Sequence, residues 1–535
     1  MTQARRVDVA IIGSGFAGSL TALALRRRGR SVALVERGRH PRFAIGESST
    51  PLANLLLEEL AATYDLPRIA PLSKWGTWRQ AYPELPVGLK RGFSFFQHQA
   101  GMPFADGPAH ERQLLVAASP HDEIGDTHWY RASLDAWLAR EAADAGAELL
   151  EETRIERVTF AGDRVVLDLR REDRPQAISA SFVIDASGPR GALSRLLQLP
   201  SAPLRWLPPT QALYTHFEGV TKWEHVSAVP LPPDPRPLTT DPLAPSRPPY
   251  QVDDAALHHV FDGGWIWVLR FDNGVTSAGA AVTDARAAQL GLQDGAPAWR
   301  RLLDRFPSIR AQFASARAVL PFVHAPRLSY RSEVVCGDRW AMLPSAAGVI
   351  DPLLSTGFPL TLLGITRLVD VLERTWNRPA RRDALAAYER QTRRELDATE
   401  RLVAALYASM DDFALFKRLG LLYFAAASYG EAVRRLGRPE LAPGFLLCDH
   451  AVFAEQCGAI CDAAGAPAGC ADRAAVVDAI DRAIEPFDVA GLGDRGRRDW
   501  YPVLADDLFA ARHKMHASAE EVSALLERCG FACRV

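Results

Sequence analysis

Three glycines and an acidic residue at fixed spacing are the first side chains in this sequence that suggest chemistry. Gly13, Gly15 and Gly18 form a Gly-x-Gly-x-x-Gly pattern, and Glu36 follows at the end of the next apolar stretch. Such glycines permit a tight turn, close approach of the backbone to a pyrophosphate, and close packing of a helix on a strand. Glu36 is placed to accept hydrogen bonds from a ribose diol. The pattern predicts a dinucleotide site at a helix N-terminus, and the alternative is the same βαβ unit without a nucleotide.

The elements around the glycines have the order that a dinucleotide site requires. Residues 7–12 are apolar apart from Asp8, as expected of a parallel strand covered on both faces. A helical stretch at 19–28 follows the glycines, and 31–35 is a second apolar strand that ends just before Glu36. Together they predict a complete βαβ unit.

The remaining sequence predicts a mixed core followed by a helical region. Residues 228–250 are crowded with proline and aspartate, which indicates an irregular surface loop or linker. From 381 onward the Ala/Leu/Arg-rich pattern is helical, so we expect a core at 1–380 and a helical C-terminal subdomain at 381–535. Within the core we expect a helix at 137–147 and strands at 154–160, 165–169, 182–185, 256–260, 265–271 and 277–282.

Composition narrows the possible partners. The 535 residues carry a formal net charge of −2, so there is no basic excess for nucleic acid or an anionic membrane. Arg5 and Arg6 are not followed by a signal peptide, and no apolar stretch reaches the length of about 20 residues that spans a bilayer, so we expect a cytoplasmic protein. The seven cysteines lack Cys-x-x-Cys spacing and predict reduced thiols rather than a metal site. The expected partner is a small molecule or another protein.

Three further segments point to FAD rather than NAD. Residues 182–188, Arg131 and residues 344–352 resemble segments that FAD-dependent monooxygenases place around the flavin. This resemblance implies an α/β fold with an FAD-binding Rossmann-type core of the glutathione-reductase/PHBH-like kind and an antiparallel sheet on the substrate side. Pro344-Ser345 stands where that superfamily usually has Gly-Asp, so we expect FAD to bind loosely, as suits exchange with a reductase.

Four other segments resemble flavin-dependent halogenases, and most closely the phenol-directed, phloroglucinol-type group. Residues 45–51 resemble the strap between flavin and substrate sites, and 264–270 resemble the Trp-x-Trp motif, although Leu269-Arg270 replaces its terminal Ile-Pro. Residues 351–357 resemble the halide-binding segment, and 89–95 resemble the stretch with the essential lysine. The resemblance implies an enzyme that uses FADH2, O2 and chloride or bromide to make hypohalous acid.

The same resemblance assigns roles to particular residues. Lys90 would receive the hypohalous acid, as a haloamine or as a hydrogen-bond donor, and Lys74 is the alternative lysine. The halide would lie at Ser355, Thr356 and Gly357. The cofactor residues would be Gly13, Gly15, Phe16, Ala17, Gly18, Glu36, Arg37, Ser48, Arg131, Asp185, Asp351 and Gly357, and the tunnel or flavin wall would comprise Glu47, Pro51, Trp265, Trp267 and Pro352.

Some of these side chains also have structural interpretations. We expect the Glu47 side chain to bond backbone within the strap. Trp265 and Trp267 alternate at strand spacing, which is typical of core packing as well as of a wall that separates flavin from substrate. His98 and His110 are expected to be surface or packing histidines rather than bases.

Two features that the sequence lacks, an activating glutamate and a second dinucleotide fingerprint, indicate the class of substrate and the source of electrons. Leu354 stands where tryptophan halogenases carry a glutamate, which favours a phenol, free or tethered to a carrier protein. The sequence has one dinucleotide fingerprint, so we expect a separate flavin reductase. The alternatives are a flavin-dependent aromatic monooxygenase and a non-catalytic FAD-binding member of the family.

Overall fold

The glycine pattern lies in the first of two large sheets. The computed structural model describes residues 4–227, 247–466 and 472–531, so most of the predicted loop at 228–250 lies outside the described residues. The first sheet comprises β1 (Arg5–Ile12), β2 (Val32–Val35), β7 (Glu148–Leu150), β8 (Thr153–Ala161), β9 (Arg164–Arg171), β10 (Arg174–Asp185), β18 (Cys336–Gly337) and β19 (Trp340–Met342).

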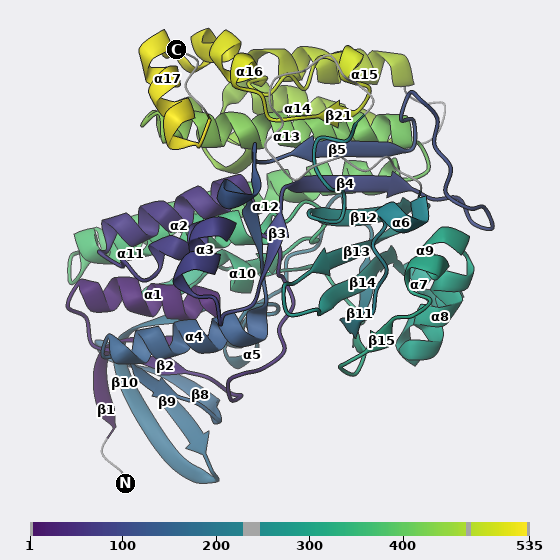
Figure 1. The fold of residues 1–535 in the computed structure, drawn as a ribbon. Coiled ribbons are helices and arrows are strands. Elements are labelled where there is room, and N and C mark those ends of the chain that lie inside the picture. Colours follow the sequence, from purple (N-terminus) through teal and green to yellow (C-terminus); the bar gives the residue numbers. More distant parts are fainter. Residues whose placement is uncertain (1–3, 228–246, 467–471, 532–535) are drawn as a thin grey trace.

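Parallel pairing places the ends of these strands at one edge. The order is β18-β19-β10-β1-β2-β7, and β1 pairs in parallel with both β10 and β2. β9 and β8 extend from β10 as antiparallel strands at the lower end of the molecule (Figure 1). The central strands are buried on both faces, which explains their continuous apolar sequences.

Helices cover this sheet on the side of the glycine turn. α1 (Phe16–Arg27) is buried from Phe16 to Leu25 because it packs between α4 (Arg131–Asp144) and α11 (Gly357–Thr375). The predicted βαβ unit is confirmed, and α4 begins six residues before the expected 137. The other short helices of the core are α2 (Pro51–Thr63), α3 (Trp75–Ala81), α5 (Ala192–Leu196), α6 (Glu224–Ser227) and α10 (Pro344–Ala347).

The second sheet is mainly antiparallel, with the order β15-β11-β14-β13-β12-β4-β5-β21 and with β16 beside β11. A separate apolar core lies between it and α7 (Asp284–Leu290), α8 (Ala296–Asp304) and α9 (Pro307–Gln312). Its strands are β4 (Gly92–Gln97), β5 (Gln113–Ala117), β11 (Thr210–Glu218), β12 (Ala256–Phe261), β13 (Gly264–Arg270), β14 (Thr276–Thr283), β15 (Arg317–Ala318), β16 (Val323–Ala325) and β21 (Trp500–Tyr501).

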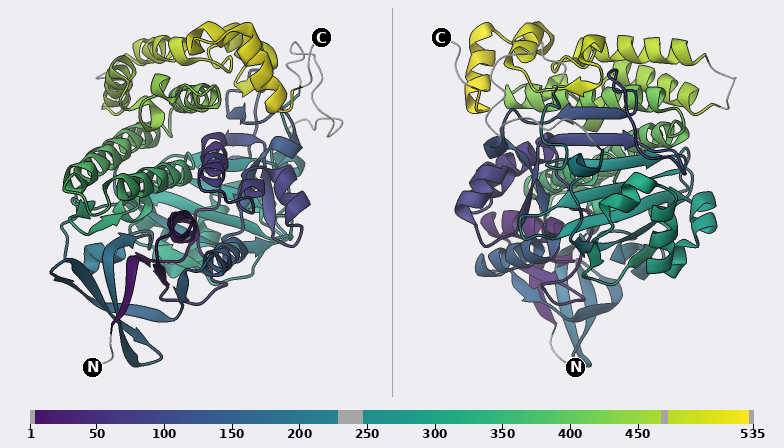
Figure 2. Two further views of the ribbon diagram at one scale, coloured as in Figure 1. Left: turned by 90° about the vertical axis from the view of Figure 1, so that its left-hand side faces the viewer. Right: turned by 45° about the vertical axis from the view of Figure 1, so that its right-hand side comes forward.

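The region after 380 is helical, as predicted, and its helices from residue 413 onward lie at the opposite end of the molecule from the N-terminus (Figures 1 and 2). One exception is β21, which joins the second sheet by pairing in parallel with β5. The first hydrophobic core runs without interruption from β1 through α11 into these helices. They are α12 (Arg381–Ala408), α13 (Phe413–Arg435), α14 (Ala451–Ala464), α15 (Arg473–Ile484), α16 (Ala505–Ala510) and α17 (Ala519–Arg528).

Two small ladders connect these layers. β3 (Val87–Lys90) pairs with β6 (Asp126–Trp129) in an antiparallel register that sets Lys90 opposite Asp126. β17 (Tyr330–Arg331) pairs with β20 (Gly348–Val349), just before the 351–357 segment. One strand of each ladder overlaps a segment that the sequence singled out for chemistry: β3 contains Lys90, and β20 lies within 344–352.

Candidate active site

The turn after β1 forms around the three glycines. Gly13 has a φ of +96°, and a Cβ there would lie 2.8 Å from the carbonyl oxygen of Ala186. A Cβ on Gly18 would lie 1.9 Å from the carbonyl oxygen of Gly13. Side chains are therefore excluded at both positions. α1 starts directly after Gly15, which caps it without a side chain, so the first turn offers backbone N–H groups to an anion.

Glu36 directly follows β2 and is 4% exposed. Its carboxylate accepts hydrogen bonds from the N–H groups of Gly38 at 2.9 Å and Ser14 at 3.1 Å, and pairs with Arg42 at 3.0 Å. Burial opposes ionisation of this carboxyl, but Arg42 and the two N–H groups outweigh burial and lower the pKa of Glu36. The carboxylate is therefore charged and fixed beside the glycine turn, while its contact with a ribose stays a prediction.

Two arginines near Glu36 have different surroundings. Arg37, which we predicted to bind the cofactor, is exposed. Arg42 contacts Glu36, and its Nη2 lies 3.7 Å from the position of a Cβ built on Gly15. Arg42 is thus a cation beside the glycine turn, and it was not among the predicted site residues. Its only signal was a basic residue shortly after the acidic end of the second strand.

Arg131 joins the glycine turn to the 45–51 strap. Its guanidinium forms a two-point ion pair with Asp135, at 2.8 Å for each contact, and donates to the carbonyl of Gly46 at 2.9 Å. Asp135 also accepts a hydrogen bond from the N–H of Phe16 at 3.2 Å. Asp135 was missed, although its position one helical turn after Arg131 is the spacing of an intrahelical pair. The bidentate geometry fixes both segments relative to α4.

Glu47 corrects one expectation about the strap. Its carboxylate lies 2.8 Å from Nε2 of His216 on β11, rather than bonding backbone within 45–51. Both side chains are buried. A buried carboxylate needs a donor, and His216 is the one that the second sheet brings into reach. The strap is thereby tied to both sheets.

The rest of the strap is shaped by Ser48 and Pro51. The Ser48 hydroxyl is buried and has no hydrogen-bond partner among the described residues. Pro51 opens α2 behind the cap Thr50, whose hydroxyl accepts a hydrogen bond from the N–H of Ala53 at 3.2 Å. An unsatisfied buried hydroxyl at this place is one that a bound cofactor can satisfy.

Asp185 ends β10 and holds the turn that packs against Gly13. Its carboxylate accepts hydrogen bonds from the N–H groups of Ser187 at 2.9 Å and Leu193 at 2.6 Å. Burial raises the pKa of Asp185, although these donors oppose the shift. Its predicted contact with the cofactor remains a prediction, because the described contacts are all within this turn.

Asp351 is the centre of a hydrogen-bond chain across three segments. Its Oδ1 accepts from the N–H of Leu353 at 2.9 Å, and its Oδ2 accepts from the hydroxyl of Tyr407 on α12, also at 2.9 Å. That hydroxyl in turn accepts from Nε1 of Trp265 at 3.1 Å. Burial raises the pKa of Asp351 to about 7. Tyr407 links the two halogenase-like motifs and was missed, because nothing in the sequence relates it to either of them.

The 351–357 segment leads into α11. Ser355 has a φ of +54°, Thr356 is the N-cap, and Gly357 is exposed with open space where a Cβ would stand. The first N–H groups of this 19-residue helix carry partial positive charge and lack partners within the helix. The hydroxyl of Tyr423 on α13 donates to the carbonyl of Leu354 at 2.9 Å. The segment is thus a fixed turn that suits a small anion.

The two tryptophans of β13 are both buried, at 1% and 6% exposure for Trp265 and Trp267. Their ring centroids are 5.6 Å apart, and Nε1 of Trp267 donates to Ser277 at 3.3 Å. Arg270, where the motif departs from the halogenase pattern, pairs with Asp253 at 3.0 Å. The departure therefore has a structural role, and the tryptophans pack in the core whether or not they also wall off a flavin. Pro352, another of the predicted wall residues, is exposed.

Lys90 is the last residue of β3 and is fully buried. Its ammonium group donates to the carbonyl of Ser49 in the strap and lies 3.8 Å from the ring centroid of Phe93. Burial lowers the pKa of Lys90, and the charge of Asp126 opposes that shift. The structure thus places a buried amine directly against the strap.

Lys74, the alternative lysine, has a different environment. It precedes α3, its side chain is 29% exposed, and its ammonium pairs with Glu58 at 3.0 Å. His98 and His110 have the surroundings of packing residues: His98 lies 3.0 Å from a ring nitrogen of His259, and the ring of His110 stacks on Trp500. Of the two lysines, Lys90 is fully buried and Lys74 is partly exposed, and the catalytic role of either stays a prediction.

These surroundings fit an FAD molecule. Gly13 and Gly18 exclude side chains from the turn, Gly357 leaves open space, and Arg42 and Arg131, each paired with a carboxylate, place guanidinium groups beside the helix start. Pro344, which stands where the usual motif has Gly-Asp, is the first residue of α10. Its ring packs against Gly364, where an added Cβ would lie only 2.2 Å from the proline ring. That departure is accommodated by helix packing.

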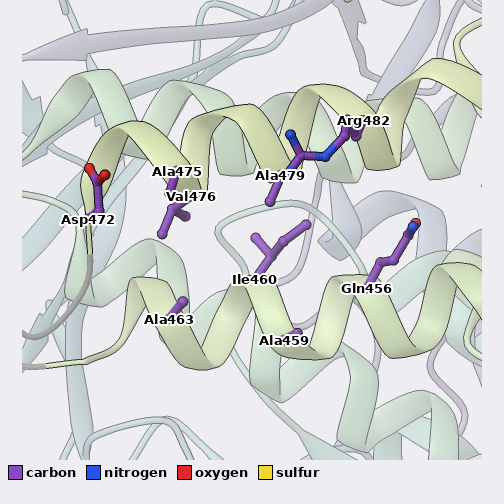
Figure 3. A pocket seen from close by; sticks show the side chains of 9 residues that line it. All are labelled: Gln456, Ala459, Ile460, Ala463, Asp472, Ala475, Val476, Ala479 and Arg482. Atoms are coloured by element: carbon purple, nitrogen blue, oxygen red, sulfur yellow. The ribbon is translucent and has the colours of Figure 1, made fainter.

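A cavity of about 390 Å³ lies elsewhere, between α14 and α15 (Figure 3). None of the residues discussed above lines it. Among the described residues, no helix is long and apolar enough to cross a membrane, and no group of His, Cys, Asp and Glu side chains is arranged to bind a metal ion. The cavity is lined by Gln456, Ala459, Ile460, Ala463, Asp472, Ala475, Val476, Ala479 and Arg482.

Comparisons with known proteins agree with this geometry. The family model described as FAD dependent oxidoreductase matches residues 8–348. The monodechloroaminopyrrolnitrin halogenase PrnC of Pseudomonas fluorescens is 28% identical over 433 residues, which cover 79% of this chain and 72% of that protein. The tetracycline 7-halogenase of Kitasatospora aureofaciens is 30% identical over 366 residues, which cover 67% of this chain and 61% of that protein.

Solved structures extend the similarity over almost the whole chain. The halogenase PltM, solved in complex with phloroglucinol and FAD, superposes with a TM-score of 0.78 at 27% identity. The superposition covers 92% of this chain and 99% of PltM. The flavin-dependent halogenase CmlS has a TM-score of 0.60 at 21% identity and shares the fold.

Proposed function

This chain belongs to the FAD-dependent oxidoreductases and, within them, to the flavin-dependent halogenases, and we propose that it halogenates a small electron-rich phenol through Lys90. When bound, reduced FAD supplies two electrons and the halide another two to O2, which gives hypohalous acid and water. The chain itself positions the halide, confines the acid and directs it to the substrate.

The 351–357 turn is the proposed halide site. Thr356 and Gly357 begin α11, where unpartnered N–H groups favour an anion, and Gly357 leaves room for it. Tyr407, through Asp351, and Tyr423, through Leu354, hold the turn in place. A preorganised set of N–H groups binds an anion without the cost of ordering the turn first.

Lys90 is the proposed acceptor of hypohalous acid. A neutral amine there exchanges an N–H bond for an N–halogen bond and releases water, whereas an ammonium donates a hydrogen bond to the acid. Either form directs the electrophilic halogen to one carbon of the substrate. The contact of Lys90 with Ser49 supports this role, because it puts the amine beside the strap that links the glycine turn to the second sheet.

A phenol is the proposed substrate class. PltM, which resembles this chain over most of its length, was solved with phloroglucinol. Leu354 supplies no carboxylate for activating a less reactive ring, and a phenol activates itself by sharing its own proton. Other relatives are named for carrier-bound pyrroles, so a carrier-tethered phenol remains within the proposal. Electrons come from a separate flavin reductase, since the sequence has one dinucleotide fingerprint.

The observation that carries the proposal is the complete burial of Lys90 beside the strap. Burial costs an amine its hydration, so a lysine without a role in the interior would be expected at the surface. Lys74 has such a solvated, ion-paired position and provides the matched control.

The test is an assay with FAD, a flavin reductase, NADH, bromide and a panel of phenols that includes phloroglucinol, with products identified by mass spectrometry. We expect a brominated phenol from the wild type and from Lys74→Ala, and a loss of at least about 100-fold in Lys90→Ala with unchanged oxidation of reduced FAD. A hydroxylated product would instead identify a monooxygenase. Bromination that survives in Lys90→Ala would contradict the role of Lys90.

A further inference from the structure

Lys90 has a buried carboxyl opposite it that the proposed reaction does not use. Asp126 on β6 is its cross-strand neighbour in the β3–β6 ladder. Lys90 is 0% and Asp126 4% exposed. In an antiparallel pair, side chains directly opposite each other project to the same face, with Cβ atoms about 5 Å apart. Lys90 and Asp126 are therefore both buried, and their side chains lie on the same face of this ladder.

The hydrogen bonds of Asp126 leave one of its oxygens free. Oδ1 accepts from Nδ2 of Asn54 on α2 at 2.7 Å, whereas Oδ2 is buried without a partner among the described residues. The Lys90 ammonium donates to Ser49. An unpartnered carboxylate oxygen in the interior is costly unless a positive charge compensates it. Lys90 is the basic residue opposite it in the ladder, and its charge acts to lower the pKa of Asp126.

The other ionisable groups near Lys90 are two histidines, and neither compensates the charge of its ammonium group. His128 on β6 and His258 on β12 are buried, and burial together with the charge of Lys90 lowers the pKa of each to about 3. Both histidines are therefore neutral near pH 7. Asp126 is the group that opposes the effect of burial on Lys90.

On the side of α13, the charges near Asp126 oppose each other. Glu431 acts to raise the pKa of Asp126 and Arg435 acts to lower it, while burial, the largest influence, raises it. Glu431 and Arg435 also pair with each other at 2.6 Å. Tyr423 is buried, and burial raises the pKa of its hydroxyl, so it stays uncharged. Lys90 and Asp126 thus depend mainly on each other.

We propose that Asp126 is a positioning residue for the amine of Lys90 and that its carboxylate determines the charge of this amine. The inference rests on the function proposed above, in which Lys90 handles hypohalous acid. Burial lowers the pKa of the amine, whereas the negative charge of the opposite carboxylate acts to raise it. Asn54 contributes to the same effect, because the hydrogen bond that its amide donates favours the ionised form of Asp126.

The test measures the charge of Lys90 directly, without an activity assay. The sequence contains five lysines, so the full chain labelled with ¹³C at lysine Cε gives few resonances, and Lys90→Arg assigns the one of interest. We expect Asp126→Asn to lower the titration midpoint of Lys90 by at least about one pH unit, a tenfold change in its protonation equilibrium. Asp126→Glu should restore most of that shift. The internal references are Lys74, Lys222, Lys417 and Lys514.

A second variant covers the case in which Asp126→Asn does not fold. Asn54→Ala leaves Asp126 in place but removes its hydrogen-bond donor, so it should lower the Lys90 midpoint in the same direction by a smaller amount. Thermal unfolding identifies the folded variants. An unchanged Lys90 midpoint in a folded Asp126→Asn or Asn54→Ala protein overturns the inference.

The pH profile of bromination separates this inference from the proposed function. In Asp126→Asn the profile should shift to lower pH together with the Lys90 midpoint, while reduced-FAD oxidation keeps its pH dependence. A midpoint that shifts without the profile overturns the positioning role of Asp126. Failure of the proposed function gives a different result, namely that Lys90→Ala still brominates the phenol.

Discussion

Asp351 is a carboxyl buried without a cation beside it among the described residues, so burial favours its protonated form over the carboxylate. Burial raises its pKa to about 7, even though the Tyr407 hydroxyl and the Leu353 N–H donate to it. The group therefore changes its charge near neutral pH. Because it fixes the 351–357 turn, its protonation affects the geometry of the proposed halide site.

Replacing Asp351 by Asn should make the stability of the protein less dependent on pH. In the wild type the folded pKa of about 7 exceeds the ordinary value of 3.8. The folded state therefore binds more protons than the unfolded state in this range, and its stability decreases as pH rises toward 7. Between about pH 5 and pH 7.5 we expect the wild type to lose on the order of 2–3 kcal/mol more free energy of unfolding than Asp351→Asn. Urea unfolding at both pH values measures the difference, and parallel losses would contradict it.

The N-termini of two helices, α1 and α11, form the proposed anion sites. α11 begins at Gly357, and the turn before it is held by Tyr407 from α12 and Tyr423 from α13. α1 begins after Gly15, in a turn that tolerates no side chain at Gly13. Each helix start combines free N–H groups with a rigid approach of the chain, which is what anion binding requires.

Tyr423→Phe should weaken the use of halide without affecting flavin. Losing the hydrogen bond to Leu354 removes about 1 kcal/mol that stabilises the turn, so we expect the bromide concentration at half-maximal bromination to rise about fivefold. Tyr429→Phe is the matched control, because that hydroxyl donates to Lys514 instead. Equal effects of the two variants would show that the turn is not involved.

Gly13→Ala should greatly reduce FAD binding. Both Gly13 and Gly29 have positive φ values, of +96° and +76°, so alanine is strained at each. Only at Gly13 does the added Cβ also overlap another backbone segment, whereas at Gly29 it meets open space. We expect Gly13→Ala to bind FAD at least about tenfold more weakly than Gly29→Ala, as measured by flavin absorbance after gel filtration. Similar FAD content in the two would argue against this turn as the cofactor site.

In the whole molecule, the C-terminal helices complete both the core and the site. The first hydrophobic core continues from β1 into α12 and α13, and Tyr407 and Tyr423 reach back from these helices to the 351–357 turn. β21 extends the second sheet beside β5. The division at residue 380 remains a prediction about sequence pattern, since packing crosses it.

A chain of residues 4–380 should therefore fail to fold on its own. It would expose the apolar face of α11 and leave Trp265 and Asp351 without Tyr407. We expect it to bind a hydrophobic dye and to lack a cooperative thermal transition, whereas a chain of residues 4–531 should unfold cooperatively and bind FAD. Cooperative unfolding of the shorter chain with FAD bound would establish an independent domain.

The sequence by itself determined the local parts of this protein. The βαβ unit, the glycine turn, five of the eight described strands of the first sheet and three of the nine of the second follow from apolar periodicity and from glycine spacing, which are properties of neighbouring residues. The motif around Lys90 was likewise readable as a short pattern. Family and cofactor followed from such motifs and agree with the comparisons.

Only the tertiary structure decided which distant groups meet. Glu47 and His216 are separated by 169 residues, and Asp351 and Tyr407 by 56, yet each pair is in hydrogen-bond contact. The partnership of Asp126 with Lys90 depends on strand register, in which a slip of one residue would turn the carboxyl to the other face. Local patterns report which face of an element is buried, whereas the partner of a buried charge is set by how the elements pack. For this reason the positions of the motifs were predictable and the groups that control their charge were not.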